Sequence, residues 1–318
     1  MGSGKTTLLK RLLTDQALDE TVVLINEFGE IGLDHLLVQD IAPDVVLLPN
    51  GCVCCSVRGD LKAALLSLEA RRQRGELPLF RRVLLETTGL ADPAPILATL
   101  AKDANLRGHY HLGLMITVVD AMHAELQERL HPEWLAQVAA ADRLLVSKDD
   151  AVEPAVLARL GERLSRLNAG AVQRLARTVS GGDELLWGQG LGGDALEQEV
   201  AHWQRFTPVE SQHHSEAQVC CLSFDAPLDW MTFGVWLSML LRCHGERILR
   251  VKGILEVINS EQPIVIHGVQ HCLHAPLHLA AWPEGPRQSR LVFIVRGLDT
   301  ALLRRSFKAF LAQPGMAA

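Results

Sequence analysis

The chain has 318 residues, of which 48% are hydrophobic, 21% charged and 5% aromatic, and its formal net charge is −6. This composition predicts a globular protein of about two domains, and it argues against nucleic acid as the main partner because no basic run is present. Neither a signal-peptide pattern nor an apolar run of membrane-spanning length occurs, so we expect a cytoplasmic protein that does not bind membranes.

Short apolar runs in the first part of the chain predict strands that are buried on both faces of a sheet. They cover residues 21–26, 45–48, 82–86, 114–120, 143–146 and 171–179, with helical patterns at about 60–74 and 153–167. Strands that alternate with helices predict right-handed crossovers. We therefore expect an α/β domain with a doubly wound, mostly parallel sheet.

The pattern changes after a polar stretch near residue 210. Strands are expected at 219–224, 247–258, 263–267 and 291–296, and helices at 230–243 and 300–311. This order predicts a second, smaller α+β domain. We place the first domain at 1–205, a linker at 206–216 and the second domain at 217–318.

The chain begins with the second half of a phosphate-binding loop. In the pattern G-x-x-x-x-G-K-[ST], backbone N–H groups surround phosphate oxygens, the Lys contacts the β and γ phosphates, and the hydroxyl binds Mg²⁺. Gly4, Lys5 and Thr6 supply its last three positions, and an apolar helical pattern follows. The predicted nucleotide contacts are Gly2, Ser3, Gly4, Lys5, Thr6 and Thr7.

Polar residues follow several of the predicted strands, at the edge where ligands bind in parallel sheets. Glu86 precedes Thr87-Thr88-Gly89, where a P-loop NTPase places an acidic residue that holds Mg²⁺ through water and a Gly that meets the γ-phosphate. Asp120 also ends a predicted strand at this edge.

Ser147-Lys148-Asp149-Asp150 fits the guanine-reading pattern N-K-x-D with Ser in place of Asn. The Asp150 carboxylate can accept hydrogen bonds from N1–H and N2–H₂ of guanine, while the Lys148 stem covers the ring. Adenine lacks that pair of donors, so the pattern favours GTP over ATP.

Three thiols occur within four residues at Cys52, Cys54 and Cys55. Three thiolates from one loop can occupy three corners of a tetrahedral Zn²⁺ site and leave the fourth for another ligand. Co²⁺ and Ni²⁺ are alternative metals. A thiol redox pair and buried apolar Cys are the competing interpretations.

Four histidines, His267, His271, His274 and His278, have helical spacing, but Pro276 and a strand-like run interrupt the pattern. We expect scattered surface histidines here rather than a metal site.

Taken together, NEFGE, NGCVCC, ETTGLADP and SKDD resemble the motifs of the CobW-type metal-chaperone P-loop GTPases, most closely the YjiA group. The resemblance spans nearly the whole chain. It implies GTP, Mg²⁺ and Zn²⁺ as ligands, with GTP state coupled to metal delivery to a client metalloprotein. It also implies that Glu27 and Glu30 lie in a switch segment near both metals, and that Lys5, Glu86 and Gly89 serve GTP hydrolysis. A monomer, or a homodimer that depends on nucleotide or metal, is expected.

The chain departs from the family pattern in three places. Some members carry an acidic residue just before Asn26, where this chain has Ile25, so a metal ligand there is lost. Ser147 replaces the usual Asn, and the family has an apolar strand and the first part of the phosphate loop before Gly2. The first hypothesis is a GTPase metallochaperone with slow intrinsic turnover. The alternatives are a non-enzymatic metal buffer with a decayed GTPase site and a thiol oxidoreductase.

Overall fold

The computed structural model describes residues 2–13, 20–25, 45–47, 57–179, 200, 217–283 and 287–311. The chain divides into two compact units, and each is treated by itself. The first comprises Met1–Gln137, Arg143–Leu160 and Gln173–Gly188, and the second comprises Val138–Asp142, Gly161–Val172 and Gln189–Ala318. The predicted linker, 206–216, lies outside the described residues.

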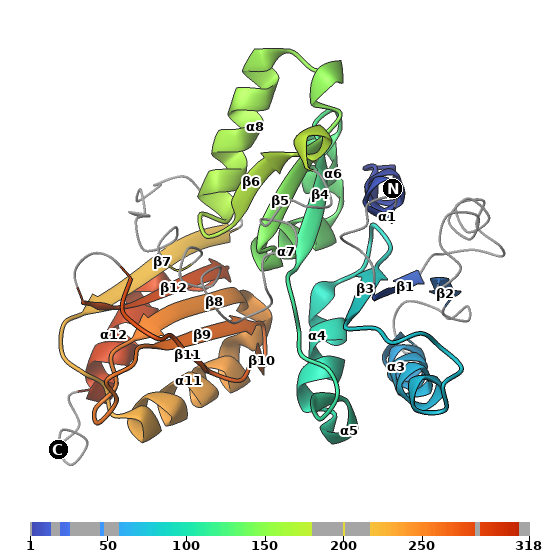
Figure 1. Ribbon diagram of the computed structural model, residues 1–318. Helices are drawn as coiled ribbons and strands as arrows, with labels where there is room; N and C mark the ends of the chain where they lie inside the picture. The colour runs from blue at the N-terminus through green and yellow to red at the C-terminus, as the bar shows by residue number, and fades with distance from the viewer. Residues whose placement is uncertain are drawn as a thin grey trace. The chain divides into compact units, whose positions relative to one another are not determined.

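The first unit contains two three-stranded sheets (Figure 1). In one, β1 (Thr21–Ile25) lies between β2 (Val45–Leu47) and β3 (Arg82–Glu86), and both pairings are parallel. In the other, β5 (Arg143–Ser147) lies between β4 (Ile116–Asp120) and β6 (Val172–Leu175), and β4 pairs with β5 in parallel. The predicted strand at 171–179 is shorter than expected, because a 3₁₀ turn, η3 (Ala176–Thr178), follows β6.

Helices cover both faces of the β1 sheet. Alternate residues of a strand point to opposite faces, so Val22 and Leu24 pack in one cluster with leucines of α3 (Val57–Gln73) and with residues of α4 (Pro93–Lys102) and α5 (Ala104–Arg107). Val23 and Ile25 pack against Leu9 of α1 (Lys5–Leu13). The predicted doubly wound α/β fold is confirmed.

Helix α1 contacts both sheets of the first unit. Leu9 packs on β1, whereas Leu8 and Leu12 cluster with Leu145 of β5 and with apolar residues of β4 and η3. The helix is therefore anchored on two sides, and so is the loop that precedes it. The remaining elements of the unit are α6 (Ala124–Leu130), α7 (Pro132–Ala140), α8 (Pro154–Leu167) and the 3₁₀ turn η2 (Asp149–Ala151), although the end of α7 and part of α8 belong to the second unit.

The second unit is built on an antiparallel sheet with the order β10-β9-β8-β12-β7, and β11 pairs with β9. The strands are β7 (Ala217–Phe224), β8 (Ile248–Leu255), β9 (Ile264–Val269), β10 (Cys272–Leu273), β11 (Leu277–His278) and β12 (Ser289–Arg296). The helices α11 (Trp230–His244) and α12 (Thr300–Leu311) pack on this sheet, and a 3₁₀ turn, η4 (Gly245–Arg247), follows α11. The predicted α+β domain is confirmed.

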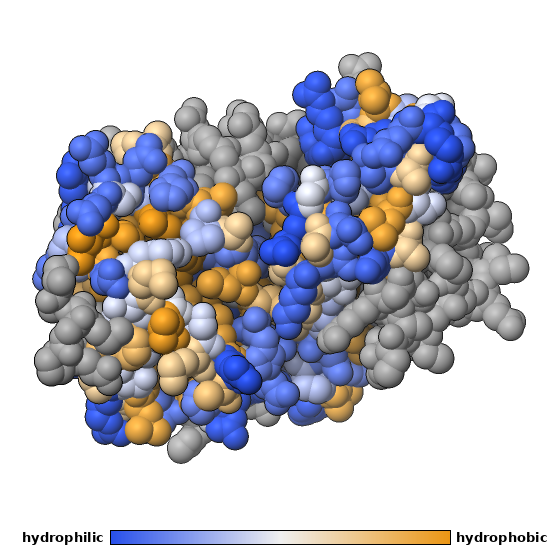
Figure 2. Space-filling model, turned by 90° about the horizontal axis from the view of Figure 1, so that it is seen from below, coloured by the Kyte–Doolittle hydropathy of each residue, from blue (hydrophilic) through white to orange (hydrophobic). Residues whose placement is uncertain are grey.

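Aromatic side chains form the centre of the core between this sheet and its helices. Trp236 of α11 meets Phe293 of β12 edge-to-face at 6.2 Å between ring centroids and lies 4.7 Å from the ring of Phe307. Its indole N–H donates to Ser306 Oγ over 3.0 Å. On the other side of α11, Met231, Val235 and Met239 are exposed. Figure 2 shows one face of the molecule, on which apolar side chains (orange) lie among polar ones (blue).

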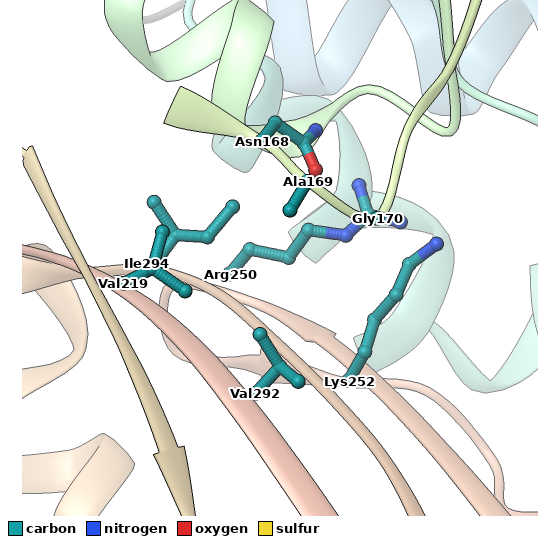
Figure 3. A pocket seen from close by; sticks show the side chains of 8 residues that line it. All are labelled: Asn168, Ala169, Gly170, Val219, Arg250, Lys252, Val292 and Ile294. Atoms are coloured by element: carbon teal, nitrogen blue, oxygen red, sulfur yellow. The ribbon is translucent and has the colours of Figure 1, made fainter. Parts of the chain in front are cut away.

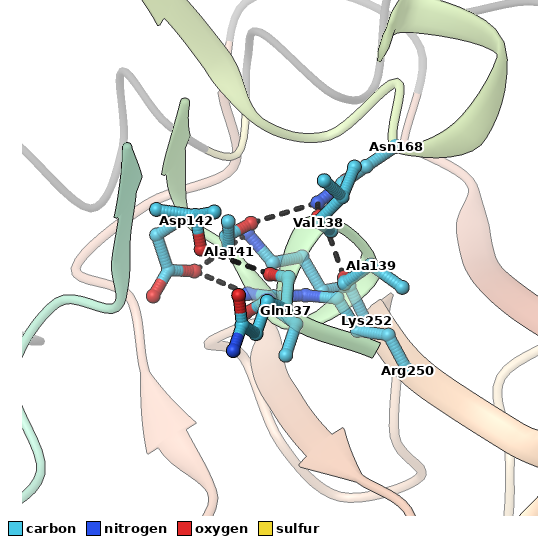
Figure 4. A network of polar contacts seen from close by, with 10 residues as sticks. Gln137, Val138, Ala139, Ala141, Asp142, Asn168, Arg250 and Lys252 are labelled. Carbon is cyan, nitrogen blue, oxygen red and sulfur yellow. Dashed lines mark hydrogen bonds and ion pairs between the residues drawn. The ribbon is translucent and has the colours of Figure 1, made fainter. Parts of the chain in front are cut away.

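A buried charged network lies on the other face of the sheet (Figure 4). Arg250 of β8 contacts Asp142 Oδ1 and the carbonyl of Ala140, and Lys252 Nζ lies 3.1 Å from the same carboxylate oxygen. Asn168 Nδ2 donates to the carbonyls of Val138, Ala139 and Ala141 at 2.8, 3.1 and 2.8 Å. The amide of Asn168 thus satisfies backbone acceptors where α7 ends, which a buried helix end requires.

A pocket adjoins this network (Figure 3). Its apolar lining comes from Val219, Val292 and Ile294, and its polar lining includes Arg250 and Lys252. Both cations point from β8 toward the turn that follows α8. Their contacts with Asp142 account for their burial, since a buried charge requires a partner.

The expectation of surface histidines is wrong for His267. This residue lies in β9 and is only 7% exposed, and burial together with the nearby Lys252 cation holds its pKa well below the ordinary value. Burial also lowers the pKa of His274 to about 4. His267 is buried because residues 264–269 form a strand covered on both faces.

Among the helices that the structure describes, none is long and apolar enough to cross a lipid bilayer.

Candidate functional site

The phosphate loop precedes α1 with the backbone geometry that its glycines permit. Gly2 and Gly4 have φ angles of 76° and 86°, in the left-handed region that favours Gly. Lys5 is the first residue of α1, and the Leu8 N–H donates to the Gly4 carbonyl at 2.9 Å. Of the other predicted contacts, Ser3 is buried, Thr6 is half-buried and Thr7 is exposed. Because the first N–H groups of an α-helix have no intrahelical partner, those of α1 can bind an anion.

Thr6 and Glu86 meet although they lie 80 residues apart in sequence. The Thr6 hydroxyl donates to Glu86 Oε1 at 2.9 Å. Glu86 is the last residue of β3 and pairs in register with Ile25, the last residue of β1. The structure thus brings a loop hydroxyl and a strand-end carboxylate together, and oxygen ligands of this kind suit Mg²⁺.

The loop after β3 is held from α7. Gln137 Nε2 donates to the carbonyls of Gly89 and Ala91, at 3.1 and 2.8 Å. Asp92 caps α4 by accepting from Ala94 N–H, and Pro93 stands at the first helical position. The end of the ETTGLADP motif is therefore explained by the start of a helix. Thr88 Oγ1 is buried and has no hydrogen-bond partner among the described residues, so a polar group is available beside Gly89.

The residues at 147–150 form a tight turn after β5. Lys148 has a left-handed backbone, with φ 56°, and η2 begins at Asp149. Arg177 of η3 donates to Asp149 Oδ2 at 2.7 Å, while Asp150 is exposed. The two adjacent carboxylates therefore differ: Asp149 is bound to Arg177, and Asp150 faces solvent.

Ser147 joins the phosphate loop to this turn. Its hydroxyl lies 2.7 Å from the Ser3 carbonyl and 3.3 Å from the Val119 carbonyl, and the side chain is buried. A Cβ on Gly4 would lie 3.8 Å from Ser147 Cβ, so the two segments are in van der Waals contact. Ser at this position, in place of the family's usual Asn, still supplies a donor to the phosphate loop.

Asp120 contacts the cation of the turn. It pairs in register with Ser147, and its Oδ2 lies 2.6 Å from Lys148 Nζ and 3.0 Å from His123 Nδ1. Burial opposes ionisation of Asp120, but the hydrogen bonds from Lys148 and His123 outweigh it and leave the pKa of this carboxyl below its ordinary value. The sequence placed Asp120 at the sheet edge but did not indicate its contact with Lys148.

Sequence reasoning also missed Gln137 and Arg177. Both act from helical segments that carry no motif of their own, and a hydrogen bond to a loop carbonyl or to a carboxylate leaves no sequence pattern. Asp120 gave one signal, because a carboxylate that ends an apolar strand must find a cation when it is buried.

The predicted metal ligands lie outside the described residues, namely Cys52, Cys54, Cys55, Glu27 and Glu30. Glu27 and Glu30 follow β1, whose last residue pairs with Glu86. Within the described ranges, no group of three or more His, Cys, Asp or Glu side chains could hold a metal ion.

Comparisons with known proteins give the family. Residues 1–173 match the CobW/HypB/UreG nucleotide-binding domain, and residues 217–311 match the cobalamin synthesis protein cobW C-terminal domain. The chain is 33% identical over 311 residues to the zinc chaperone YjiA of Escherichia coli K12, which covers 96% of this chain and 95% of that protein. It is 30% identical over 176 residues to zinc-regulated GTPase metalloprotein activator 1 of Schizosaccharomyces pombe, across 53% of this chain and 41% of that protein.

A solved structure agrees over the full length. The crystal structure of Zn(II)-bound YjiA GTPase from E. coli superposes with a TM-score of 0.71 at 25% sequence identity, covering 98% of this chain and 96% of that chain. The chain therefore belongs to the CobW/HypB/UreG family, as its motifs predicted, and to the GTPase class of that family.

Proposed function

We propose that this chain is a GTP-hydrolysing metallochaperone that binds Zn²⁺ or a similar metal through Cys52, Cys54 and Cys55 and delivers it to a client protein. The observation that carries the GTPase half is the hydrogen bond from Thr6 to Glu86, which assembles two Mg²⁺ ligands of the kind that phosphoryl transfer uses. The names of the relatives, zinc chaperone and zinc-regulated metalloprotein activator, support the metal half.

The nucleotide site follows from the segments that converge on it. The N–H groups at the start of α1 and the Lys5 ammonium bind the phosphates, and the anchoring of α1 on both sheets fixes their direction. Gly89 approaches the γ-phosphate from a loop that Gln137 holds in place. Asp150 reads the guanine edge, since it is exposed whereas Asp149 is bound to Arg177.

Thr6 and Glu86 would hold Mg²⁺. The buried Thr88 hydroxyl, two residues after Glu86, has no hydrogen-bond partner among the described residues, which suits a polar ligand near this loop. When bound, Mg²⁺ neutralises charge that develops on the phosphoryl oxygens. Lys5 stabilises the same charge from α1. The sequence motifs include no obvious Gln or Arg finger, so slow intrinsic turnover is expected.

The base assignment has a direct test in Asp150→Asn. Xanthine carries a carbonyl where guanine carries N2–H₂, so an amide at this position can donate where the carboxylate accepted. We expect the variant to prefer XTP to GTP, measured as competition for a fluorescent guanine nucleotide and as phosphate release. Asp149→Asn is the matched control and should keep the preference for GTP. An unchanged preference in Asp150→Asn contradicts the assignment.

The metal half is tested by Cys54→Ser with Cys55→Ser, in competition with a chromogenic chelator for Zn²⁺. The expected result is a loss of at least tenfold in affinity, because two of three thiolates are removed. Cys243→Ser is the control, since this cysteine is exposed on α11. Equal Zn²⁺ affinity in the parent, the double variant and the control contradicts the proposed metal site. Zinc binding without any GTP turnover supports the metal-buffer alternative instead.

A further inference from the structure

Asp120 is a buried carboxylate at the edge where the nucleotide is proposed to bind. Its residue exposure is 1%, and it ends β4 beside Ser147 of β5. One oxygen, Oδ1, accepts from the Met122 N–H at 2.9 Å, which fixes the rotation of the carboxylate. The other, Oδ2, faces Lys148 and His123.

The contact with Lys148 is short and directed. Nζ lies 2.6 Å from Oδ2, and this geometry is typical of a charge-assisted hydrogen bond. Attraction between the two charges is strengthened because Asp120 is excluded from water. The Lys148 stem is therefore held at both ends, by the left-handed backbone at one end and by Asp120 at the other.

His123 stabilises the same oxygen from the side of α6. Its ring nitrogen lies 3.0 Å from Oδ2, while half of its side-chain surface is exposed. With Met122 and Lys148, it gives the carboxylate three donors. A carboxylate bound in this way cannot rotate toward solvent without losing them.

The position of Lys148 matters only if its stem lies against the purine. A free Lys side chain loses much rotamer entropy when it is ordered on binding, and a side chain that is already ordered does not. Asp120 supplies that order without reaching the ligand. Its ion pair therefore affects recognition of the base, whereas the phosphates are bound by α1.

We propose that Asp120 is a positioning residue for guanine nucleotides, and that it acts by holding Lys148 over the base. This inference rests on the proposed GTP site. It adds a requirement that the N-K-x-D pattern does not contain, namely a carboxylate that ends the neighbouring strand and accepts from the Lys of the motif.

The test is a double-mutant cycle on GDP affinity with Asp120→Asn and Lys148→Met. Asn keeps the acceptor for Met122 and removes the charge, and Met keeps an apolar stem of similar length. We expect D120N to weaken GDP binding about tenfold in the parent chain and less than twofold in the K148M chain. The same loss in both backgrounds, or no loss in the parent, overturns the proposal.

Two further measurements separate positioning from a general structural role. D120N should weaken ADP binding by a similar factor, because the Lys148 stem covers either purine, and it should leave the affinity for inorganic tripolyphosphate unchanged, because the phosphates are bound by α1. Equal losses for GDP and tripolyphosphate contradict the proposal. A parent chain with no preference for GDP over ADP contradicts the proposed GTP site instead.

The matched control is Asp103→Asn. Asp103 forms a Lys–Asp pair of the same length, 2.6 Å to Lys62, at the start of α5. Its loss should change GDP affinity less than twofold. If D120N does not fold, His123→Ala decides the question, because His123 is half exposed and contacts the same oxygen. We expect a two- to threefold loss of GDP affinity with tripolyphosphate affinity unchanged, and an unchanged GDP affinity overturns the proposal.

Discussion

Asp142 pairs with both Arg250 and Lys252 in the second unit. The side chains of Arg250 and Lys252 are 6% and 4% exposed, and that of Asp142 is 13% exposed. Asp142→Ala would leave two cations in a region with little access to water. We expect this variant to be strongly destabilised, because the loss of one partner from a buried ion pair is costly.

The expected loss of unfolding free energy is that of breaking a buried ion pair. Removal of one partner of a buried pair costs about 3–5 kcal/mol of unfolding free energy. For a unit of this size, that corresponds to a fall in Tm of roughly 6–20 °C. Asp142→Asn keeps an oxygen acceptor for one of the two cations, so its cost should lie between those of the parent and the Ala variant.

The assay is urea unfolding followed by tryptophan fluorescence, to which Trp236 in the core of the same unit contributes. Arg166→Ala is the matched control, since its ion pair with Glu162 is also in this unit, on α8, but both side chains are more than half exposed. We expect the control to cost less than about 0.5 kcal/mol. A cost for Asp142→Ala no greater than that of the control would refute the reasoning.

Three other predictions concern the second unit. Asn168→Asp turns a carboxylate toward three carbonyl oxygens and should cost about 2–4 kcal/mol in urea unfolding, and a neutral result would mean that those carbonyls have other donors. Trp236→Ala should cost about 3–5 kcal/mol in urea unfolding followed by circular dichroism, since the substitution removes the fluorescent reporter, unless the surrounding aromatic rings collapse into the cavity. Burial and the Arg250 cation lower the pKa of His274 to about 4, below the unfolded value near 6.5. The folded state therefore favours the neutral imidazole, and the protein loses stability as pH falls from about 6.5 toward 4. His274→Gln should reduce this loss by roughly 2 kcal/mol between pH 7 and 4.5, and an identical pH profile would contradict it.

Strands and helices with a continuous pattern could be predicted from the sequence almost to the residue. β3 and α12 have the bounds expected for them, because β3 is a short apolar run followed by a polar loop and α12 has one apolar face. The strand at 171–179 was overestimated because an apolar run does not reveal where a 3₁₀ turn replaces a strand. His267 was misplaced for a related reason, since the sequence shows the spacing of the histidines but not that both faces of β9 are covered.

The candidate site also has features that the sequence predicts and features that it does not. Motifs predicted candidate residues for phosphate and base recognition, such as Lys5, Glu86 and Lys148, since such recognition imposes fixed local spacing, and these roles stay predictions. Contacts between motifs could not be predicted, because the distance from Thr6 to Glu86 or from Lys148 to Asp120 depends on the register of neighbouring strands.

Ser147 shows how this register changes the meaning of a sequence difference. The sequence presents Ser as a departure from the usual Asn, and a shorter side chain suggests a lost contact. In the fold, β5 ends next to the phosphate loop, and a hydroxyl at that point is long enough to donate to the Ser3 carbonyl. What the position requires is a buried donor within reach of the loop, and either residue type meets that requirement when the strand brings it close enough.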